Sequence, residues 1–462
     1  MRGGELHNRH WQELCRRFLP IAPEGSVWRY SRSATSEDLD QGWKLHISAT
    51  VLSANEVFER AGPLLARRQV LFKAPVSLWE LARINAGLSY GYCQVGKFIT
   101  VYPRSNSEAA YLAARLDKLT RSYPAPQIPF DLKLRPRSNV YFRYGAFRHL
   151  EMTHFDGSRL AALKDPAGNL APDLRYSPLA RPEWADIPFQ VRTVETRNRS
   201  IENPLNSAYR GFLALSQRGK GGVYKALDFT SQSPRVCILK EGRRHGEVGW
   251  DGRDGFWRIE NEERALLSLR ASGVDVPRVY SSFVVGGNRY LATEFIAGED
   301  LHAFLTRRRH RLTITSALDL GLRLAELVQS LHRAGWAWRD CKPSNLIVTR
   351  EGLRPIDFEG ACPVDCGDPV PWGTPAFVAP EWRSSNNSSS GIPEDLYSVG
   401  AVVYFLLTGK TPNAEAPTPI QKLRDNVPTK LRALVGQLLS SNPERRPTIE
   451  DAVRRLRKAR RV

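Results

Sequence analysis

A short run in the C-terminal half of the chain places an acid, a cation and two oxygen ligands close together. Residues 338–345 read WRDCKPSN, and residues 356–360 read IDFEG. Phosphoryl transfer between two hydroxyls needs an in-line geometry, a carboxylate to accept the hydroxyl proton, and metal ions that neutralise phosphate charge. The candidates for these roles are Asp340 as the base, Lys342 on the transferring phosphoryl group, and Asn345 and Asp357 as Mg²⁺ ligands.

A second set of reactive side chains lies in the first third of the chain. Residues 42–48 (GWKLHIS) alternate in polarity as in a half-buried strand, so Lys44, His46 and Ser48 share one face. Helical segments are expected at 54–65 and 107–119, the latter with Ser107 as N-cap. Further strands are expected at 71–75, 97–104 and 139–145. The additional cationic or phenolic candidates on those strands are Lys73, Lys97, Tyr102 and Arg143. Together they could form a phosphate pocket, although surface strands often carry Lys and His without a function.

A glycine-rich turn between two expected strands lies at residues 212–224, FLALSQRGKGGVY. Glycines let the backbone approach nucleotide phosphates and offer N–H groups to them. The candidates here are Gly219, Gly221, Gly222 and Val223. Ser216 and Arg218 stand where the usual G-x-G-x-x-G-x-V pattern has its first two glycines, so an ordinary hairpin turn is the alternative interpretation.

Three later segments complete a nucleotide site. Lys240 ends the strand VCILK, and a helix follows in which Glu262, or alternatively Glu263, is expected to pair with that lysine. The backbone groups of Glu294 and Ile296, at the end of a buried strand, are expected to meet the adenine edge.

These motifs resemble those of the protein kinases, and the Lys342-Pro343 step resembles serine/threonine kinases. The resemblance implies that Arg446 pairs with Glu381 in a structural role. Trp338 replaces the usual histidine, and Glu359 replaces the glycine after Asp357-Phe358. Neither position supplies the base or the usual metal ligands. Residues 359–373 contain no Ser, Thr or Tyr, so we expect activity that needs no phosphorylation in that segment.

The first third has a resemblance of its own. The run SEDLDQGWKLHISAT, with FKAP, GKFITVYP and SNVYFRYG after it, is similar to the lyase domain of class III and class IV lanthipeptide synthetases, which resembles phosphothreonine lyases. In that family phosphoserine or phosphothreonine loses phosphate by β-elimination, leaving dehydroalanine or dehydrobutyrine. The resemblance implies Lys73 as the base, His46 as the acid and Lys44 as a phosphate ligand. The other members that it implies for the pocket are Lys97, Tyr102 and Arg143.

Length and composition fit this organisation. A chain of 462 residues suggests two domains or more. We expect an α+β, multidomain protein: an extension at 1–26, a phosphothreonine-lyase-like α+β domain at 27–150, an ordered connector at 151–205, and a bilobal protein-kinase fold at 206–462. The expected kinase lobes are 206–295 and 296–462. The net charge of +19 favours anionic partners, but no nucleic-acid-binding signature accompanies it. Six scattered cysteines and the lack of a signal peptide or a long apolar run indicate a cytoplasmic protein without membrane insertion.

The sequence therefore predicts a bifunctional enzyme that uses ATP or another nucleoside triphosphate with Mg²⁺. It would phosphorylate Ser/Thr of a ribosomally synthesised precursor peptide carrying a leader, and then eliminate the phosphate. No cyclase follows the kinase motifs in this sequence, so ring formation would fall to a separate cyclase, occur spontaneously, or not occur; a truncated sequence would read the same. The alternatives are a serine/threonine kinase with a regulatory N-terminal domain and a non-catalytic peptide-binding scaffold.

Overall fold

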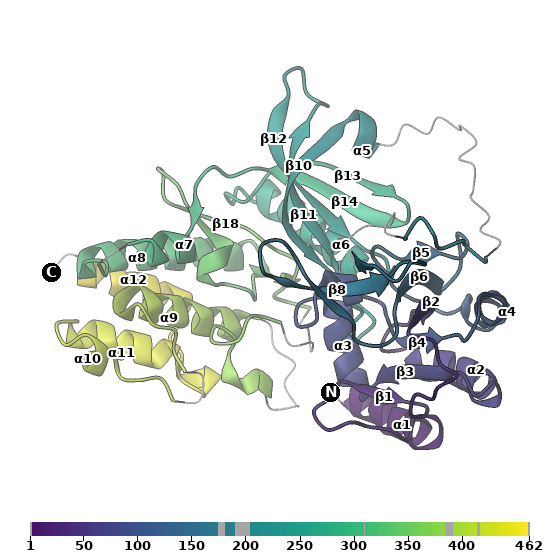
Figure 1. Cartoon of the computed structure of the whole chain (residues 1–462). Helices are drawn as coiled ribbons and strands as arrows, with labels where there is room; N and C mark the ends of the chain where they lie inside the picture. Colours follow the sequence, from purple (N-terminus) through teal and green to yellow (C-terminus); the bar gives the residue numbers. More distant parts are fainter. Residues whose placement is uncertain are drawn as a thin grey trace.

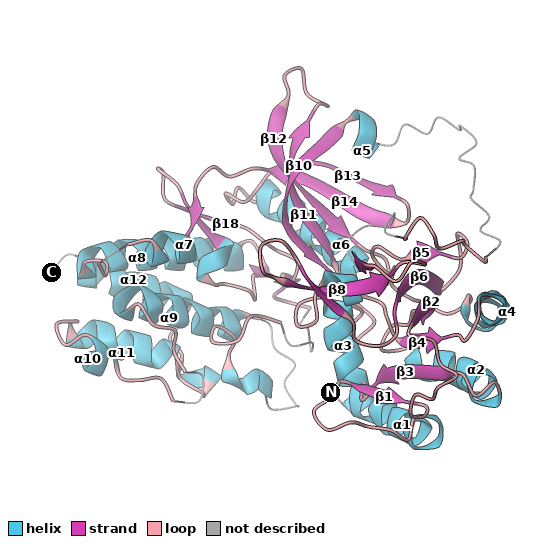
Figure 2. Ribbon diagram, viewed as in Figure 1, coloured by secondary structure: helices cyan, strands magenta, loops and turns pink. Residues whose placement is uncertain are grey.

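The computed structural model describes residues 2–173, 181–189, 204–308, 310–366, 368, 370, 372–383, 391–413 and 416–460. Figure 1 shows an N-terminal domain beside a kinase fold with two lobes, and Figure 2 shows that helices and strands are mixed in both parts. The predicted α+β class and bilobal kinase fold are thereby confirmed. Among the described helices, none combines the length and the apolar composition that crossing a membrane requires.

The N-terminal domain is built on a six-stranded antiparallel sheet in the order β1-β3-β4-β2-β6-β5. Its strands are β1 (Trp28–Tyr30), β2 (Gln41–Ile47), β3 (Leu71–Pro75), β4 (Ile99–Tyr102), β5 (Leu132–Lys133) and β6 (Val140–Ala146). Its helices are α1 (Arg2–Phe18), α2 (Ala54–Arg67), α3 (Leu78–Ala86), the short η1 (Tyr92–Gln94) and α4 (Asn106–Thr120).

The sheet has one apolar face and one polar face, and strand alternation decides which residues lie on each. Trp43, Leu45 and Ile47 of β2 are buried in a core that they share with α1, α2 and α4. Lys44 and His46 point to the opposite face. The strand faces predicted for β2 are therefore correct, and the Lys44 and His46 side chains point away from the helices.

Helix α1 belongs to the same core, although the sequence places residues 1–26 in an extension. The Trp11 side chain is fully buried, and its ring lies 4.9 Å from that of Phe58 and 5.3 Å from that of Phe98. Its indole N–H donates to the Pro75 carbonyl at 3.1 Å. Helix α1 is thus part of the fold of the N-terminal domain.

Two local expectations differ from the structure. The N-cap of α4 is Ser105, which accepts the Glu108 N–H at 3.1 Å, rather than Ser107. Ser105 has a glutamate three residues later, which is the spacing of a capping box. In addition, β4 begins at Ile99 because residues before it form a tight turn, with the Phe98 N–H donating to the Gly96 carbonyl. Phe98 therefore precedes the strand and packs in the apolar core.

The described part of the connector packs on the N-terminal domain. It forms a small sheet of β7 (Glu151–Thr153), β8 (Arg159–Lys164) and β9 (Leu170–Pro172). The Gln41 side-chain amide donates to the Lys164 carbonyl at 2.6 Å, and the Trp43 indole donates to the Asp186 carbonyl at 3.0 Å. The predicted connector residues 174–180 and 190–203 lie outside the described residues.

The N-lobe of the kinase fold is a five-stranded antiparallel sheet in the order β10-β11-β12-β14-β13, with helix α6 packed against it. Its elements are α5 (Pro204–Ser207), β10 (Tyr209–Arg218), β11 (Gly221–Asp228), β12 (Arg235–Gly242), α6 (Gly255–Ala271), β13 (Val279–Val285) and β14 (Asn288–Glu294).

The C-lobe is mainly helical and surrounds α9, most of which is buried. Its helices are α7 (Leu301–Thr306), α8 (Ile314–Arg333), η2 (Pro343–Asn345), η3 (Pro380–Arg383), α9 (Ile392–Thr408), α10 (Ile420–Leu423), α11 (Thr429–Leu438), η4 (Pro443–Arg445) and α12 (Ile449–Arg460). Its short strands are β15 (Glu299–Asp300), β16 (Trp336–Ala337), β17 (Leu346–Val348), β18 (Leu353–Pro355) and β19 (Cys362–Pro363).

The N-terminal domain contacts the kinase N-lobe directly. The ring of Trp250, from the loop between β12 and α6, lies 5.0 Å from that of Trp79 in α3. The Arg243 guanidinium lies 4.9 Å from the Tyr92 ring centroid, within reach of a cation–π interaction. The third contact is a backbone hydrogen bond of 3.0 Å, from the Gly219 N–H to the Ala86 carbonyl at the end of α3. The glycine-rich turn is thus attached to the neighbouring domain.

Candidate active sites

Asp340 lies at the centre of a hydrogen-bond network in the cleft between the kinase lobes. The Lys342 ammonium donates to its Oδ2 at 2.7 Å, and the Thr374 hydroxyl donates to its Oδ1 at 3.0 Å. Burial, together with the charge of Asp357, raises the pKa of Asp340, while Lys342 opposes the shift. A carboxylate with a raised pKa is better suited to accept a hydroxyl proton. Thr374 is a member of this site that sequence reasoning did not assign to it.

The Lys240 ammonium joins α6 to the IDFEG segment. It donates to both carboxylate oxygens of Glu262, at 2.7 and 2.8 Å, and to Asp357 Oδ1 at 3.0 Å. Glu263, the alternative partner, instead accepts from Arg289 at 2.6 Å. Burial works to lower the pKa of Lys240, but the charges of Asp357 and Glu262 raise it above the ordinary value. The lysine is therefore a fixed cation at the place where nucleotide phosphates would bind.

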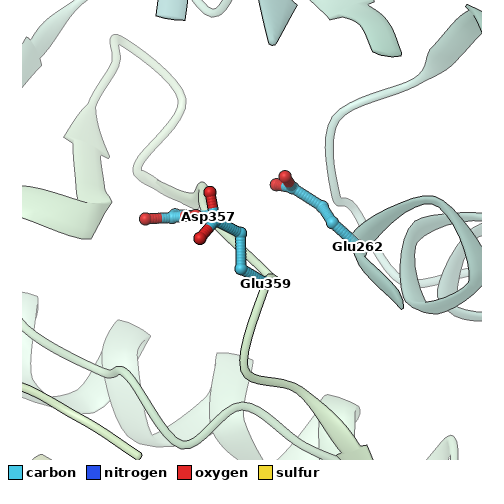
Figure 3. A group of neighbouring side chains, drawn as sticks. All are labelled: Glu262, Asp357 and Glu359. Carbon is cyan, nitrogen blue, oxygen red and sulfur yellow. The ribbon is translucent and has the colours of Figure 1, made fainter. Parts of the chain in front are cut away.

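The donor set around Asp357 fits a hard divalent cation. Ligand oxygens of Glu262, Asp357 and Glu359 all lie within 4.8 Å of one another, and Figure 3 shows Glu262 directed toward the other two carboxylates. The Asn345 side-chain NH₂ donates to Asp340, which leaves its amide oxygen as the potential metal ligand. Asp357 has a φ of 66°, a sparsely populated conformation for a non-glycine residue and one typical of functional sites. Carboxylate and amide oxygens are the ligands that Mg²⁺ prefers.

Trp338, which replaces the usual histidine, supports the metal-binding segment. Its indole N–H donates to the Asp357 carbonyl at 3.0 Å, and its ring stacks on that of Phe358 at 5.6 Å. Its backbone N–H donates to Asp395 Oδ2 at 2.8 Å. The tryptophan therefore places a donor against the backbone of Asp357.

The glycine-rich turn packs against protein backbone. A Cβ on Gly219 would collide with the Asn85 carbonyl, and one on Gly221 would collide with the Glu241 carbonyl. At Gly222 the neighbour is the Tyr224 hydroxyl. The absence of side chains at the first two positions is thus required by the protein's own packing. The N–H of Gly219, proposed from sequence for a phosphate, is given to Ala86.

The remaining predicted nucleotide contacts lie on β11 and at the end of β14. Val223 pairs with Lys240 across β11 and β12. The Glu294 N–H donates to the Arg278 carbonyl at 2.8 Å, and its carboxylate pairs with Arg354. Ile296 is buried. These contacts assign the residues of the strand end no nucleotide contact.

A cavity of about 630 Å³ lies in the cleft between the kinase lobes, beside Asp340 and Asp357. It joins the carboxylates of Asp340 and Asp357 to residues of the N-lobe and to the beginning of α1. Its lining includes Gly3, Lys220, Trp250, Asp340, Asp357 and Trp372. The N-terminal domain therefore forms part of the entrance to the kinase site.

Ion pairs hold two residues of the segment that follows Asp357-Phe358, here called the activation segment (residues 359–381). Asp368 accepts from Arg253 Nη1 at 2.6 Å and from Arg339 Nη1 at 2.7 Å. Arg253 precedes α6, and Arg339 adjoins Asp340, so one carboxylate joins the N-lobe to the loop that carries Asp340. Further along, Arg446 pairs with Glu381 at 2.6 Å as the sequence predicts. Asp368 and Glu381 are thus held by arginines without a phosphate.

A second cavity, of about 610 Å³, lies on the polar face of the N-terminal sheet. Lys44, Lys73 and Tyr102 line it together, as predicted. The Lys73 ammonium lies 4.4 Å from the Trp28 ring centroid, and the Lys44 ammonium lies 5.7 Å from that of Tyr102. Three further basic residues of the lining were not singled out from sequence: Arg32, Arg148 and His149.

His46 lies behind this cavity in a buried ionic group. Its Nδ1 is 2.5 Å from Asp131 Oδ2, and the Lys97 ammonium is 3.3 Å from the other oxygen. Cross-strand pairing places Thr100 opposite both His46 and Lys73, so the histidine and that lysine are two strands apart. Adjacent strands lie about 5 Å apart, so their backbones are about 10 Å apart at this level.

Two predicted phosphate ligands do not line the cavity. Lys97 lies within the buried group, and Arg143 forms an ion pair with Asp173 of the connector. Both cations therefore already have carboxylate partners, Asp131 and Asp173. Sequence reasoning missed these two acids because they come from segments without recognisable periodicity.

The buried histidine should make the N-terminal domain sensitive to acid. Burial lowers the pKa of His46 to about 4, against 6.5 as its ordinary value, with Asp131 opposing and Lys97 assisting the shift. As pH falls from 6.5 to 4, the unfolded chain takes up this proton first, so the folded state loses up to about 3 kcal/mol. Chemical unfolding followed at several pH values should show a weaker acid dependence in His46→Gln than in the wild type. Equal slopes would contradict the assignment.

Comparison with known proteins agrees with this division of the chain. Residues 22–200 match the family described as RamC, N-terminal domain, and residues 219–456 match the protein kinase domain. The chain is 32% identical over 397 residues to a probable SapB synthase of Streptomyces coelicolor, covering 83% of this chain and 41% of that protein. It is 31% identical over 265 residues to the serine/threonine-protein kinase PknA of Mycobacterium tuberculosis, covering 52% of this chain and 58% of PknA. The chain thus spans less than two thirds of either relative. It belongs to the protein kinase family and, with its RamC N-terminal domain, is related to the class III lanthipeptide synthetases.

Proposed function

We propose that this chain is a bifunctional peptide dehydratase. Its kinase half phosphorylates Ser/Thr of a ribosomally made precursor peptide, and its N-terminal domain then eliminates the phosphate. The observation that carries this proposal is the polar-face cavity, where Lys44 and Lys73 lie together on the same chain as a complete set of kinase side chains. An ordinary kinase has no need of the cavity.

In the first step Asp340 accepts the proton of the acceptor hydroxyl as its oxygen attacks the γ-phosphorus of ATP. The bond from that phosphorus to the bridging oxygen breaks and ADP leaves. Lys342, 2.7 Å from the base, faces the transferring phosphoryl group. Asn345 and Asp357 would hold Mg²⁺, which neutralises phosphate charge when it is bound.

In the second step Lys73, as the neutral amine, removes the Cα proton of the phosphorylated residue. The Cβ–O bond breaks, a Cα–Cβ double bond forms, and phosphate departs. Lys44 holds the phosphate charge. His46, which lies behind the cavity, is assigned as the acid that in its protonated form supplies the proton to the leaving oxygen. We assign Asp131 and Lys97 to positioning His46. Asp131 contacts the His46 ring, Lys97 contacts Asp131, and neither residue lines the cavity.

The proposal extends to the domain boundaries, the partners and the cellular compartment. The domain boundaries are those predicted from sequence, except that α1 joins the N-terminal domain. The leader of the precursor peptide and a separate cyclase are the expected partners, and the cytoplasm is the expected compartment. Joining two sites on one chain raises the effective concentration of phosphopeptide at the second site.

The test is intact-mass spectrometry of a candidate precursor peptide co-expressed with the wild-type chain. Loss of one water per modified residue is the expected result. Stable addition of phosphate without water loss would favour the alternative, a serine/threonine kinase with a regulatory N-terminal domain, which the similarity to PknA over the kinase half also accommodates. Absence of any mass change with peptides that bind would favour the scaffold.

The proposed kinase step should need no phosphate in its activation segment, because Asp368 already joins Arg253 to Arg339. Asp368→Asn leaves two arginines without their shared carboxylate and should lower kcat by roughly 10-fold or more. Steady-state phosphorylation of the peptide by the purified variant checks this. Asp365→Asn, an exposed position of the same segment, is the matched control. An essential phosphate mapped at Thr374, the first hydroxyl residue after Phe358, would contradict the prediction.

A further inference from the structure

Lys220 is the residue at the tip of the glycine-rich turn that enters the kinase site. It follows Gly219 and precedes β11, and its ammonium forms an ion pair with Glu359. It lines the same cavity as Asp340 and Lys342. The Lys220 side chain therefore shares this cavity with the carboxylates of Asp340 and Asp357.

The turn that carries this lysine is held from two sides. On one side Gly219 donates its N–H to Ala86 of the N-terminal domain at 3.0 Å. On the other, the Lys220 carbonyl accepts the Arg243 N–H at 2.8 Å, and a Cβ on Gly255 would collide with that carbonyl. A side chain projecting from a backbone fixed in this way is directed into the cleft with little freedom. The loss of conformational entropy on binding a ligand is correspondingly small.

We propose that Lys220 is a ligand for the terminal phosphates of the bound nucleotide, positioned by the N-terminal domain through Gly219. This assignment rests on the proposed kinase step. Three carboxylates (Glu262, Asp357 and Glu359) lie within 4.8 Å of one another. Of the two lysines beside them, Lys240 is tied to Glu262 and Asp357, whereas the Lys220 ammonium has Glu359 as its carboxylate partner.

The chemistry of Glu359 explains how the lysine becomes available. A glycine at this position, as in most kinases, could not hold Lys220 in the absence of nucleotide. With the glutamate, Lys220 is kept within the cleft as one member of an ion pair. It can exchange that carboxylate for phosphate oxygens, which bind an ammonium equally well and carry more charge. When Lys220 has moved to the phosphate, Glu359 faces the Asp357 side of the site, where a divalent cation would bind.

The experiment is calorimetric titration of the full-length chain with ATP, ADP, AMP and adenosine in EDTA, so that binding is measured without turnover. Lys220→Met should weaken ATP binding by roughly 10- to 100-fold, the range of a charge-assisted hydrogen bond, and change adenosine binding less than twofold. Arg210→Met is the matched control. It removes the same charge from the far end of the same hairpin, where Arg210 contacts the Phe229 ring, and should bind all four ligands as the wild type does.

Glu359→Gln separates a phosphate ligand from a purely structural ion pair. If Lys220 binds phosphate, removal of its competing carboxylate should leave metal-free ATP binding unchanged or tighter. If the ion pair only shapes the loop, both variants should weaken ATP and adenosine alike, and the inference is overturned. Equal ATP affinity in Lys220→Met and the wild type also overturns it. A wild-type chain that binds none of the four ligands would instead reject the proposed kinase step itself.

Discussion

Replacement of Lys73 by alanine should turn the chain from a dehydratase into a net kinase. The precursor peptide is then expected to keep one phosphoryl group at each modified residue, because the base that removes the Cα proton is gone while the kinase site is untouched. Loss of a general base typically lowers a rate by about 10²- to 10⁴-fold. Intact-mass spectrometry of the co-expressed peptide distinguishes the two products directly.

The structure explains why this effect should be specific. Lys73 lies on β3 beside the Trp28 ring and lines the cavity with Lys44, and neither is among the described residues that line the kinase cavity. Lys118→Ala is a suitable control, since Lys118 is an exposed lysine on α4, which covers the opposite face of the sheet. A purified phosphopeptide offered to both variants isolates the elimination step. Full dehydration by Lys73→Ala would contradict the assignment of the base.

The kinase cleft could be anticipated largely from sequence because its parts lie on short, local elements. Asp340, Lys342 and Asn345 belong to one loop, so their spacing alone brings them together. Lys240 and Glu262 come from a strand and the following helix, and the structure pairs them at 2.7 Å. The N-terminal cavity was harder to predict from the sequence. Strand alternation indicated which face carries Lys44 and His46, but not how deep each residue lies.

Three aspartates that form ion pairs with residues of the two sites could not be predicted from the sequence. Asp131, Asp173 and Asp368 each neutralise a residue that was singled out from sequence or that adjoins the catalytic loop. Each is isolated in a segment of irregular structure, and its partner is distant in the chain. A carboxylate with no periodic context gives no signal until the fold brings its partner near. The same holds for Gly219, whose packing partner belongs to another domain.

Replacement of Asp340 by asparagine should abolish most of the kinase step, just as Lys73→Ala should abolish most of the elimination. Asp340→Asn keeps the hydrogen-bonding shape of the side chain but removes the proton acceptor, so phosphorylation should fall by about 10²- to 10⁴-fold. The carboxylate accepts from Lys342, Asn345 and Thr374, and the amide oxygen of asparagine can retain part of this network. Folding should therefore survive, which a thermal melt would show.

The two variants together test whether the chain contains two independent sites. Asp340→Asn should leave an unphosphorylated peptide unmodified but should still dehydrate a supplied phosphopeptide, whereas Lys73→Ala should do the reverse. Asp425→Asn, at an exposed position of the C-lobe, controls for the loss of one carboxylate. If Asp340→Asn also failed on the phosphopeptide, the elimination would depend on the kinase cleft, and the assignment of the N-terminal cavity as its site would have to be abandoned. If both activities persisted, Asp340 would not be the base. Only the crossed pattern, in which each variant retains the step that the other has lost, is consistent with successive reactions at two separate sites.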